Sequence, residues 1–528
     1  MTSVPDTASF PASRRSRCTW LALAFVLFVA GWQGATARPT HPWSGIDDFT
    51  AYLLHGHNLL EGRPYADLGD LSDPELPDAN LREAFPPVYP WVLAQVERLV
   101  PALEGAEAPP LGVNVLAFKR VQAVIFAAQL LLLFFVFRRL MGDKLALALL
   151  VVLGTNAFLF QFREFVRSES LFGLVVAGLF LVMAKLDEQP SDAARRWVLA
   201  IVAGLLGWVV YGTRTAGMVV PLAVLAHELW TRRRVRKPVC LVLALTLAGM
   251  LLQKLMFASV VGGYLDHAKA RLGPATVLEN VRHFQWELER ILAEGLPDGL
   301  RSVVVMIFGA LAAYGLLSRL RKPSLPEVFA AGTLAMHLLL PTDSAWLRYL
   351  IPLLPVFVFL VLVGARALGQ RLLGAGDAVA LVTAGLFVAL TVPGHLAQPS
   401  GPLPDGPGTP DAREALAWIR ERSAPSHVVG FRKPWALSLA TGRPAHLYGL
   451  DHLHAELSVS EQLAHLERMR TRWLLLRHRE RRDVLPFKIL DYDDREVLAS
   501  VIEPHPERFA ERARNSEFVL YEVLEPTR

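Results

Sequence analysis

Cysteine is scarce in this chain, which has only Cys18 and Cys240 among its 528 residues. Both lie beside basic clusters that the topology below assigns to the cytoplasmic face, where thiols stay reduced. The sequence also lacks a Walker loop, a dinucleotide-binding fingerprint, a nucleophile elbow in context, and the Cys-x-x-Cys or His-Glu-x-x-His metal motifs. A disulfide framework is therefore not expected, and a soluble nucleotide cofactor has no support.

Charged residues are also few, since they make up 20% of the chain against 53% for apolar residues. A chain this long and this hydrophobic exceeds one ordinary soluble domain. The net charge of +5 comes from short basic clusters between apolar runs, a distribution typical of membrane-orientation signals. We therefore predict a mainly α fold, a polytopic transmembrane helical bundle, and exclude nucleic acid as a partner.

Apolar runs long enough to cross a membrane recur along the chain. We predict about eleven spans, near residues 19–36, 119–137, 144–162, 169–185, 197–213, 215–231, 238–261, 300–318, 326–341, 349–366 and 377–396. The first span follows Arg14, Arg15 and Arg17 and precedes Ala35-Thr36-Ala37, a pattern that also fits a cleavable signal peptide. Its length favours a retained helix.

Lys and Arg collect in every second loop of this arrangement, as the positive-inside rule requires. The inner loops hold clusters such as Arg138 with Arg139, the run 232–234, and Arg319 with Arg321. This alternation predicts an inner N-terminus and an outer C-terminus. The span 326–341 is the weakest, and its loss would invert everything that follows it.

The predicted outer face receives two long loops, 37–118 and 262–299, and long loops often carry function. Within 262–299, apolar residues recur at helical spacing from Val277 to Leu292. This pattern indicates a helix that lies either in the plane of the membrane interface or packed on the bundle. The first loop contains the acidic pair considered below.

The bundle, residues 1–398, is followed by a Pro/Gly linker over 399–410. The composition then becomes charged and typical of a soluble domain. A helix is predicted over 411–422, and short strands over 427–431, 473–477 and 518–523. Residues 411–528 are therefore predicted to form a small α/β domain on the outer, periplasmic side.

Asp47 and Asp48 lie about ten residues past the first span. Ionisable groups at a membrane surface are costly and usually have a task. A pair of aspartates at a helix end can also be a solvated cap or a salt-bridge partner. The pair is therefore a candidate acid/base centre whose context decides between these interpretations.

The context is a set of short motifs in order along the chain. They are DDFTAY (47–52), NLLEGRPYAD (58–67), FPPVYP (85–90), YGTRTAG (211–217), RYLIPLLP (348–355), EALAWIR (414–420) and FRKP (431–434). The ordered set resembles the GT-C class of membrane glycosyltransferases, in particular the branch of the protein O-mannosyltransferases and the lipid A aminoarabinose transferase. The resemblance implies transfer of a sugar from a polyprenyl-phosphate carrier to an acceptor on the outer face, with one carboxylate of the acidic pair as base. Many relatives have Asp-Glu where this chain has Asp-Asp, which leaves open which carboxylate is the base.

The chemistry of such a transfer indicates further residues. A phosphate leaving group departs as an anion and needs positive charge, and Arg binds phosphate bidentately. Arg214 and Arg348 lie at outer ends of predicted spans, where they can either bind the lipid phosphate or snorkel to the interface. Glu169 is a second acidic candidate, or a charge favoured by the helix dipole. The remaining substrate-binding candidates are Tyr89, Arg163, Arg167 and Tyr349.

A divalent cation is the one cofactor that remains open, because His55 and His57 follow the acidic pair on a predicted helix. Interfacial histidines without a metal are the alternative interpretation.

The predicted function is that of a polyprenyl-phosphate-sugar-dependent hexosyl- or pentosyltransferase in the bacterial inner membrane, active on the periplasmic side. Its expected partners are membrane lipid, the lipid-linked donor, and a glycan, lipid or protein acceptor. The alternatives are a lipid or sugar transporter or flippase, a receptor or scaffold, and a related enzyme such as an O-antigen ligase or a glycosyltransferase that uses a pyrophosphate carrier. A transporter would place its ionisable residues at the bilayer midplane, whereas here they cluster at the outer edges.

Overall fold

The fold is described from a computed structural model of the chain. The structure describes residues 12–43, 46–65, 68, 85–100, 111–190, 194–257, 273–293, 296–339, 346–396, 403, 406–448, 457–478 and 494–524. Within these ranges the side chains of residues 12–16, Asp47, Trp346 and Leu347 are not described. The sequence-based candidate Asp47 thus lies outside the described side chains.

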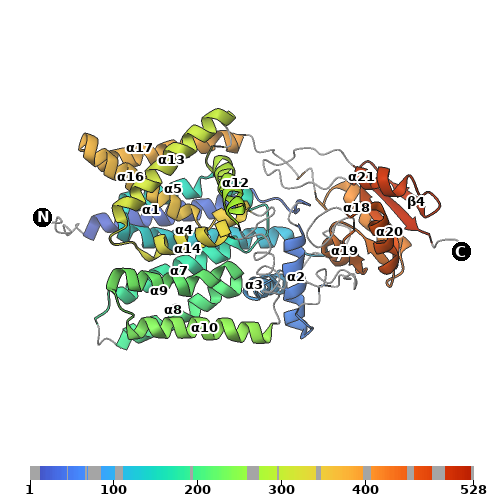
Figure 1. Ribbon diagram of the computed structural model, residues 1–528, viewed down its shortest axis with the longest axis horizontal. Coiled ribbons are helices and arrows are strands. Elements are labelled where there is room, and N and C mark those ends of the chain that lie inside the picture. Colours follow the sequence, from blue (N-terminus) through green and yellow to red (C-terminus); the bar gives the residue numbers. More distant parts are fainter. Residues whose placement is uncertain are drawn as a thin grey trace.

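Eight helices in the described residues are long and apolar enough to cross a membrane. They are α1 (Ala12–Ala35), α4 (Val115–Met141), α7 (Glu169–Asp187), α8 (Ala194–Thr213), α10 (Lys237–Met256), α13 (Asp298–Arg319), α16 (Leu354–Leu373) and α17 (Gly376–Leu396). They run along the long axis of the molecule, with the two chain termini at opposite ends (Figure 1). The assignment of the two ends to membrane faces stays a prediction.

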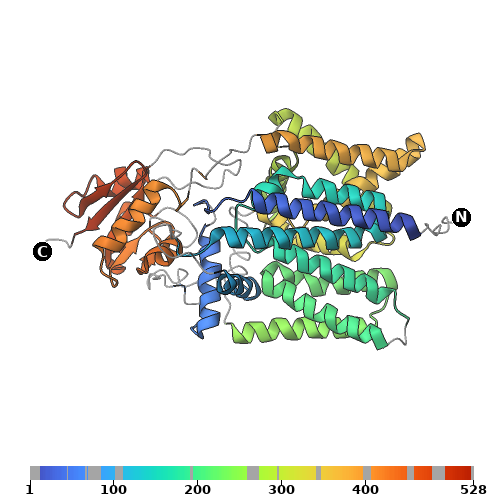
Figure 2. The same ribbon diagram turned by 180° about the vertical axis from the view of Figure 1, so that it is seen from behind.

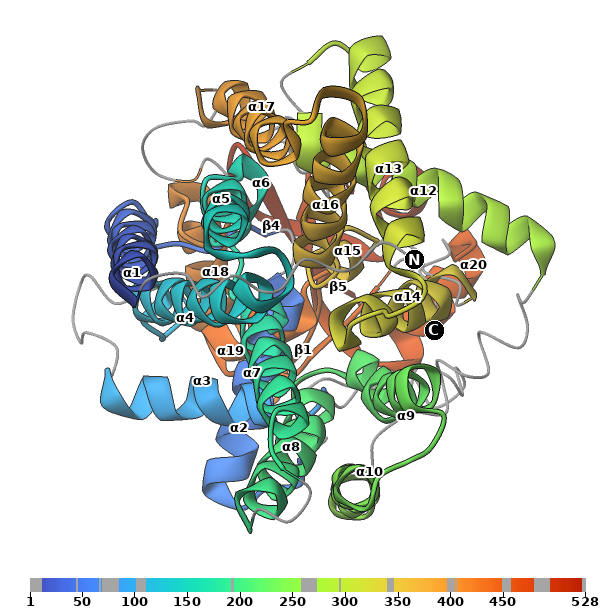
Figure 3. The same ribbon diagram turned by 90° about the vertical axis from the view of Figure 1, so that its left-hand side faces the viewer.

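Three predicted spans differ from the structure. The run 144–162 is two helices, α5 (Asp143–Gly154) and α6 (Ala157–Phe162), because the side chain of Asn156 caps α6 by accepting a hydrogen bond from the amide of Leu159. The run 215–231 begins as a 3₁₀ turn, η1 (Thr215–Met218), before α9 (Val219–Arg232). The run 326–341 is the shorter helix α14 (Leu325–Leu339). All of these elements lie within the bundle (Figure 3).

The predicted span 349–366 also starts differently. A short helix, α15 (Trp346–Leu350), precedes α16, and Pro355 stands in the first turn of α16. Proline is accepted there because the first helical amides have no intrahelical partner. This break places Arg348 and Tyr349 on a separate short helix at the end of the bundle.

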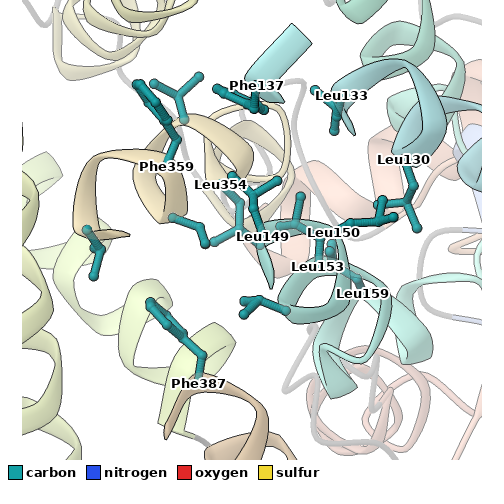
Figure 4. Close-up of a cluster of buried hydrophobic side chains, with 14 of the residues drawn as sticks. Leu130, Leu133, Phe137, Leu149, Leu150, Leu153, Leu159, Leu354, Phe359 and Phe387 are labelled. Atoms are coloured by element: carbon teal, nitrogen blue, oxygen red, sulfur yellow. The ribbon is translucent and has the colours of Figure 1, made fainter. Parts of the chain in front are cut away.

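A large apolar core joins α1, α4, α5, α13, α16 and α17. Figure 4 shows part of it, including Leu149, Leu153 and Phe359. Glycines allow the closest helix approach: a Cβ on Gly364 of α16 would lie 1.9 Å from the carbonyl oxygen of Leu311 in α13. Small residues at such contacts let helices pack without a hydrophobic driving force between them.

One end of the bundle is covered by elements that run across it. Helices α2 (Ile46–Glu61) and α3 (Val88–Leu99) lie there, with α2 between the bundle and the C-terminal domain (Figures 1 and 2). Helix α12 (Pro274–Ala293) is the helix predicted in loop 262–299. It packs on the bundle, since the Nδ2 of Asn280 donates to the carbonyl oxygen of Leu338 at 2.8 Å. The apolar side chains of Leu278 and Trp286 on this helix are exposed. A position of α12 in the membrane interface therefore stays a prediction.

The C-terminal domain is the predicted α/β domain. Its five-stranded sheet has the order β2-β1-β3-β5-β4, parallel for β2, β1 and β3 and antiparallel for the other pairs. The strands are β1 (Val428–Gly430), β2 (Ala445–His446), β3 (Thr471–Arg477), β4 (Phe509–Arg514) and β5 (Phe518–Val523). The helices are α18 (Pro410–Arg422), α19 (Pro434–Thr441), α20 (Val459–Arg468) and α21 (Arg495–Val497). The π-helical turn η2 (Leu498–Ile502) continues α21. The three predicted strands and the helix are confirmed, β2 and β4 were not predicted, and Thr409 is the N-cap of α18.

The C-terminal domain and the described residues of the loop 37–118 share one hydrophobic core. The ring of Trp43 packs on Phe431 and Phe518, with ring centres 5.6 and 6.1 Å apart. In the linker, Gly406 has a φ of +126°, and a Cβ there would lie 2.1 Å from the carbonyl oxygen of His41. Only glycine fits this conformation and this approach. The C-terminal domain is thereby held against the loop that carries the acidic pair.

Candidate functional site

Asp48 lies in the first turn of α2, where that helix crosses the end of the bundle (Figure 1). The neighbouring side chains Ile46 and Phe49 are fully buried, so burial of these apolar residues anchors the start of the helix. The ring of Phe49 stacks on His41, with centres 5.1 Å apart. The Asp48 carboxylate is consequently held in one position relative to the bundle.

Arg348 joins the two acidic candidates. Its Nη1 donates to Oδ2 of Asp48 at 2.6 Å, and its Nε donates to Oε1 of Glu169 at 2.6 Å. These residues come from α15, α2 and α7, and Arg348 is 300 positions away from Asp48. The structure therefore brings together three residues that the sequence analysis proposed separately.

Arg214 completes the contacts of Glu169. Its Nη1 lies 2.5 Å from Oε1 of Glu169, and the same nitrogen donates to Oγ of Ser168 at 3.3 Å. The hydroxyl of Tyr52 lies 3.2 Å from that Oγ. Glu169 is fully buried at the N-terminus of α7, where two arginines and the helix dipole compensate its charge.

Arg167 is a third arginine at this position. Its Nε lies 3.6 Å from Oδ2 of Asp48, which is an ion pair but too long for a hydrogen bond. Within the described part of the chain, neither Nε of Arg167 nor Oε2 of Glu169 has a hydrogen-bond partner. Buried charged atoms without partners are rare and typical of a place where a ligand or water binds.

Electrostatic interactions follow from this arrangement. Burial lowers the pKa of Arg348, but the charges of Asp48 and Glu169 outweigh burial and raise that pKa well above its ordinary value. Burial and the neighbouring Arg348 charge lower the pKa of Arg167. Burial raises the pKa of Tyr52, so its hydroxyl stays protonated and can donate. In the described side chains, three arginines face two carboxylates, which leaves the site with an excess of positive charge.

The two tyrosine candidates lie beside these charges. The guanidinium carbon of Arg214 is 5.9 Å from the ring centre of Tyr349, within cation–π range. Tyr349 also stacks on His337 of α14, with ring centres 4.1 Å apart. Tyr89 is buried and packs edge-on against Tyr52 at 4.9 Å. Tyr349 thus lies next to Arg214, whereas Tyr89 packs against Tyr52.

Arg163, by contrast, is not brought to the site. It donates to the carbonyl oxygens of Gln33 and Thr36 at the end of α1, and it pairs with Glu164 at 3.4 Å. Glu164 in turn binds the fully buried Lys119 at 2.5 Å. Arg163 therefore stabilises the packing of α1 on the turn between α6 and α7, which gives it a structural role.

The histidine candidates also have other contacts. Nδ1 of His55 lies 2.7 Å from the carbonyl oxygen of Tyr65, and its Nε2 accepts from the amide of Phe85 at 3.4 Å. His57 pairs with Glu97 at 2.5 Å. The described residues contain no group of three or more His, Cys, Asp or Glu side chains that could hold a metal ion.

Sequence comparison gives no relative, since neither a protein-family model nor a curated protein matches the chain. Structure comparison does give matches. The archaeal oligosaccharyltransferase AglB from Archaeoglobus fulgidus, in complex with an inhibitory peptide and a dolichol-phosphate, is 13% identical with a TM-score of 0.56, over 87% of this chain and 69% of AglB. ArnT from Cupriavidus metallidurans, bound to undecaprenyl phosphate, is 13% identical with a TM-score of 0.54, over 96% of this chain and 98% of ArnT.

The chain has the GT-C fold. The fold predicted from the resemblance is thereby confirmed, and apo AglB gives the same result with a TM-score of 0.58 at 14% identity, over 89% of this chain and 70% of AglB. In this GT-C chain, Ser168, Tyr52 and His337 are contacts of the site that the sequence analysis missed. Ser168 precedes the candidate Glu169 and Tyr52 stands in the first motif, so the sequence could have indicated both residues. No sequence signal indicated His337.

Proposed function

We propose that this protein is a glycosyltransferase that moves a sugar from a polyprenyl-phosphate carrier to an acceptor hydroxyl at the outer face of the membrane. The observation that carries the proposal is the convergence of Asp48, Glu169 and Arg348 with Arg214 and Arg167 at one end of the bundle. Dolichol-phosphate bound to AglB and undecaprenyl phosphate bound to ArnT support a polyprenyl-phosphate ligand on this fold.

The reaction is an inverting displacement. The acceptor oxygen attacks the anomeric carbon opposite to the phosphate, an aspartate of the pair accepts the hydroxyl proton, and the bond from the anomeric carbon to the phosphate oxygen breaks. The polyprenyl phosphate leaves as an anion and binds Arg214 and Arg348. Glycoside hydrolysis, by comparison, requires a second carboxyl group as general acid.

The ion pairs of Arg348 also suggest how the base becomes available. A guanidinium has five N–H donors, and the contacts to Asp48 and Glu169 use Nη1 and Nε. A lipid phosphate can bind the remaining donors and competes with Asp48 for Nη1. Donor binding would then release the Asp48 carboxylate for the acceptor proton.

The test is an assay of purified protein with undecaprenyl phosphate carrying mannose, glucose or 4-amino-4-deoxyarabinose, in which release of undecaprenyl phosphate is measured. We expect turnover of at least one donor, and a loss of about 10²- to 10⁴-fold when the general base is removed. Asp47→Asn and Asp48→Asn are compared, and the variant with the larger loss identifies the base.

The matched control is Asp187→Asn, at the opposite end of α7, which should keep its turnover. If both Asp47→Asn and Asp48→Asn turn over like wild type, the assignment of the base is wrong. If no lipid-linked sugar is consumed, a transporter becomes the better interpretation.

A further inference from the structure

Helix α14 carries two buried polar side chains that the proposed reaction does not use. Thr333 and His337 are only 1% and 4% exposed. Their spacing of four residues places them one turn apart on the same face of the helix. Across the ranges that the structure describes, neither Oγ1 of Thr333 nor Nδ1 of His337 has a hydrogen-bond partner. Buried polar atoms without a partner destabilise a fold and are therefore uncommon.

Thr333 also differs from other helical threonines of this chain. Thr155 and Thr213 each donate to the carbonyl oxygen four residues earlier, at 2.8 Å, and Thr383 does so at 2.9 Å. This back-bond is the usual way to satisfy a buried helical hydroxyl. Among the described residues Thr333 makes no such bond, so its hydroxyl can bind another group.

The two side chains lie next to the arginines of the site. The ring of His337 stacks on Tyr349 at 4.1 Å and 25°, and Tyr349 in turn lies 5.9 Å from the guanidinium carbon of Arg214. On the same face of α14, Phe329 packs on Phe180 of α7 with ring centres 5.5 Å apart. Thr333 and His337 therefore lie between the arginines and the apolar interior of the bundle, where α14 stands beside α9 (Figure 3).

We propose that Thr333 and His337 bind hydroxyl groups of the sugar on the polyprenyl-phosphate donor and so determine which sugar is accepted. The inference rests on the proposed function. The sugar is bonded directly to the phosphate, so a phosphate on Arg214 and Arg348 places the sugar one side chain away from these arginines, where Tyr349 and His337 lie. Aromatic walls with a few convergent polar groups are typical of small-molecule sites.

Other parts of the donor fit these atoms less well. The polyprenyl chain has no donor or acceptor and would leave both buried atoms without a partner. The phosphate charge is met by the arginines, whose forked donors match it better than one hydroxyl and one imidazole do. A sugar hydroxyl both donates and accepts, so it can satisfy Oγ1 of Thr333 and either tautomer of His337.

The experiment compares binding of bare undecaprenyl phosphate with binding of undecaprenyl phosphate carrying each of the three sugars named above. Thr333→Val keeps the shape of the side chain and removes its hydroxyl, and His337→Phe keeps the ring stack and removes Nδ1. We expect each variant to bind the accepted sugar donor about tenfold more weakly, the loss of one hydrogen bond. Binding of bare undecaprenyl phosphate should stay at the wild-type value, which also shows that the variants are folded.

Two further variants make the result specific. Thr383→Val in α17 removes a hydroxyl that is satisfied within its own helix and should leave donor binding unchanged. His337→Asn keeps a polar atom near the position of Nδ1 and should retain the preference among sugars better than His337→Phe does.

Each outcome decides the matter. Unchanged donor binding in both Thr333→Val and His337→Phe overturns the inference while the proposed function stands. Equal weakening of the donor and of bare undecaprenyl phosphate also overturns it, since these side chains would then act on the lipid phosphate. If wild type binds no sugar donor more tightly than bare undecaprenyl phosphate, the inference fails too, and if it also turns over none of them, so does the proposed function.

Discussion

Helix α7 has a carboxylate at each end, Glu169 at the candidate site and Asp187 at the opposite end of the bundle. The two carboxylates belong to ion-pair clusters of different composition. At the site end, Glu169 and Asp48 meet three arginines. At the opposite end, Asp187 and Glu228 meet only two, Arg232 and Arg236. Within these ion pairs, arginines and carboxylates are equal in number at the opposite end, whereas arginines outnumber the described carboxylates at the site end.

The two clusters also differ in where their members come from. Asp187 ends α7, Glu228 lies on α9 and Arg236 is the N-cap of α10, so that Asp187 and Arg236 are 49 positions apart in the chain. The site end collects residues from α2, α7, α15 and the turns before α7 and η1. A balanced cluster of neighbouring segments stabilises a fold, whereas a positive excess collected from distant segments is suited to bind an anion.

The largest expected effect is on stability at the opposite end. Glu228 is 1% exposed and accepts hydrogen bonds from Nε and Nη2 of Arg236. Glu228→Gln should destabilise the protein by roughly 3 kcal/mol, because a buried ion pair loses one partner. Thermal unfolding in detergent measures the loss. Turnover per folded molecule should not change, and a loss of turnover in the folded fraction would remove the distinction between the two ends.

A loss of activity is expected when the arginine of the site end, but not that of the opposite end, is replaced by lysine. Arg348→Lys keeps the charge but cannot donate to Asp48 and Glu169 at once from a planar fork. We expect kcat/KM to fall about 100-fold, measured as release of undecaprenyl phosphate. Arg236→Lys should change kcat/KM by less than about twofold. Similar losses in the two variants would contradict the assignment of a binding role to Arg348 alone.

Removal of a negative charge from the site end should strengthen the binding of the lipid phosphate. Glu169→Gln removes a negative charge from a site that already has an excess of arginines. Bare undecaprenyl phosphate should then bind up to about tenfold more tightly at low salt, with the gain reduced at high salt by screening. Fluorescence or calorimetric titration at two salt concentrations measures this. Weaker binding would show that Glu169 chiefly positions the arginines.

The smallest effect is a pH dependence at the site end, in the pair of His57 and Glu97 that joins α2 to α3. The hydrogen bond that Nε2 of His57 donates to the Glu97 carboxylate raises the pKa of His57 above its ordinary value of 6.5. Because the folded pKa is raised, the pair stabilises the fold below the unfolded pKa, and this stability is lost as the pH rises through the folded pKa. Glu97→Gln should lower the unfolding temperature at pH 6 by the equivalent of about 1 kcal/mol or less.

The effect of the same substitution should be smaller at pH 9 than at pH 6, because His57 of wild type loses its proton as the pH rises. A Glu97→Gln effect of the same size at both would mean that the pair contributes packing rather than charge.

Much of the fold could be predicted from local pattern. Long apolar runs indicated the eight long helices, since a span requires about 20 apolar residues wherever it lies in the chain. Short apolar segments in the C-terminal region indicated β1, β3 and β5. The errors lie where local chemistry interrupts an apolar run: Asn156 caps a helix in mid-run, and Pro352 and Pro355 separate α15 from α16. Composition alone does not register such breaks.

The candidate site, like the fold, could be predicted from the sequence only in part. The residue types were predictable, because sugar transfer from a phosphate needs a base and cations, and Asp48, Glu169, Arg214 and Arg348 stand in short motifs. Arg163 carries the same charge in the same turn as Arg167, yet it binds the end of α1. Which of two neighbouring arginines reaches Asp48 depends on the direction of a single turn.

The sequence by itself determined that this protein is a helical membrane bundle with an α/β domain after it, because hydrophobic length and periodicity are local properties. Only the tertiary structure decided that Arg348 joins two carboxylates, one of them 300 positions away, and that His337 stacks on Tyr349. Contacts between distant segments depend on how the helices pack against one another, and no short stretch of sequence contains that information.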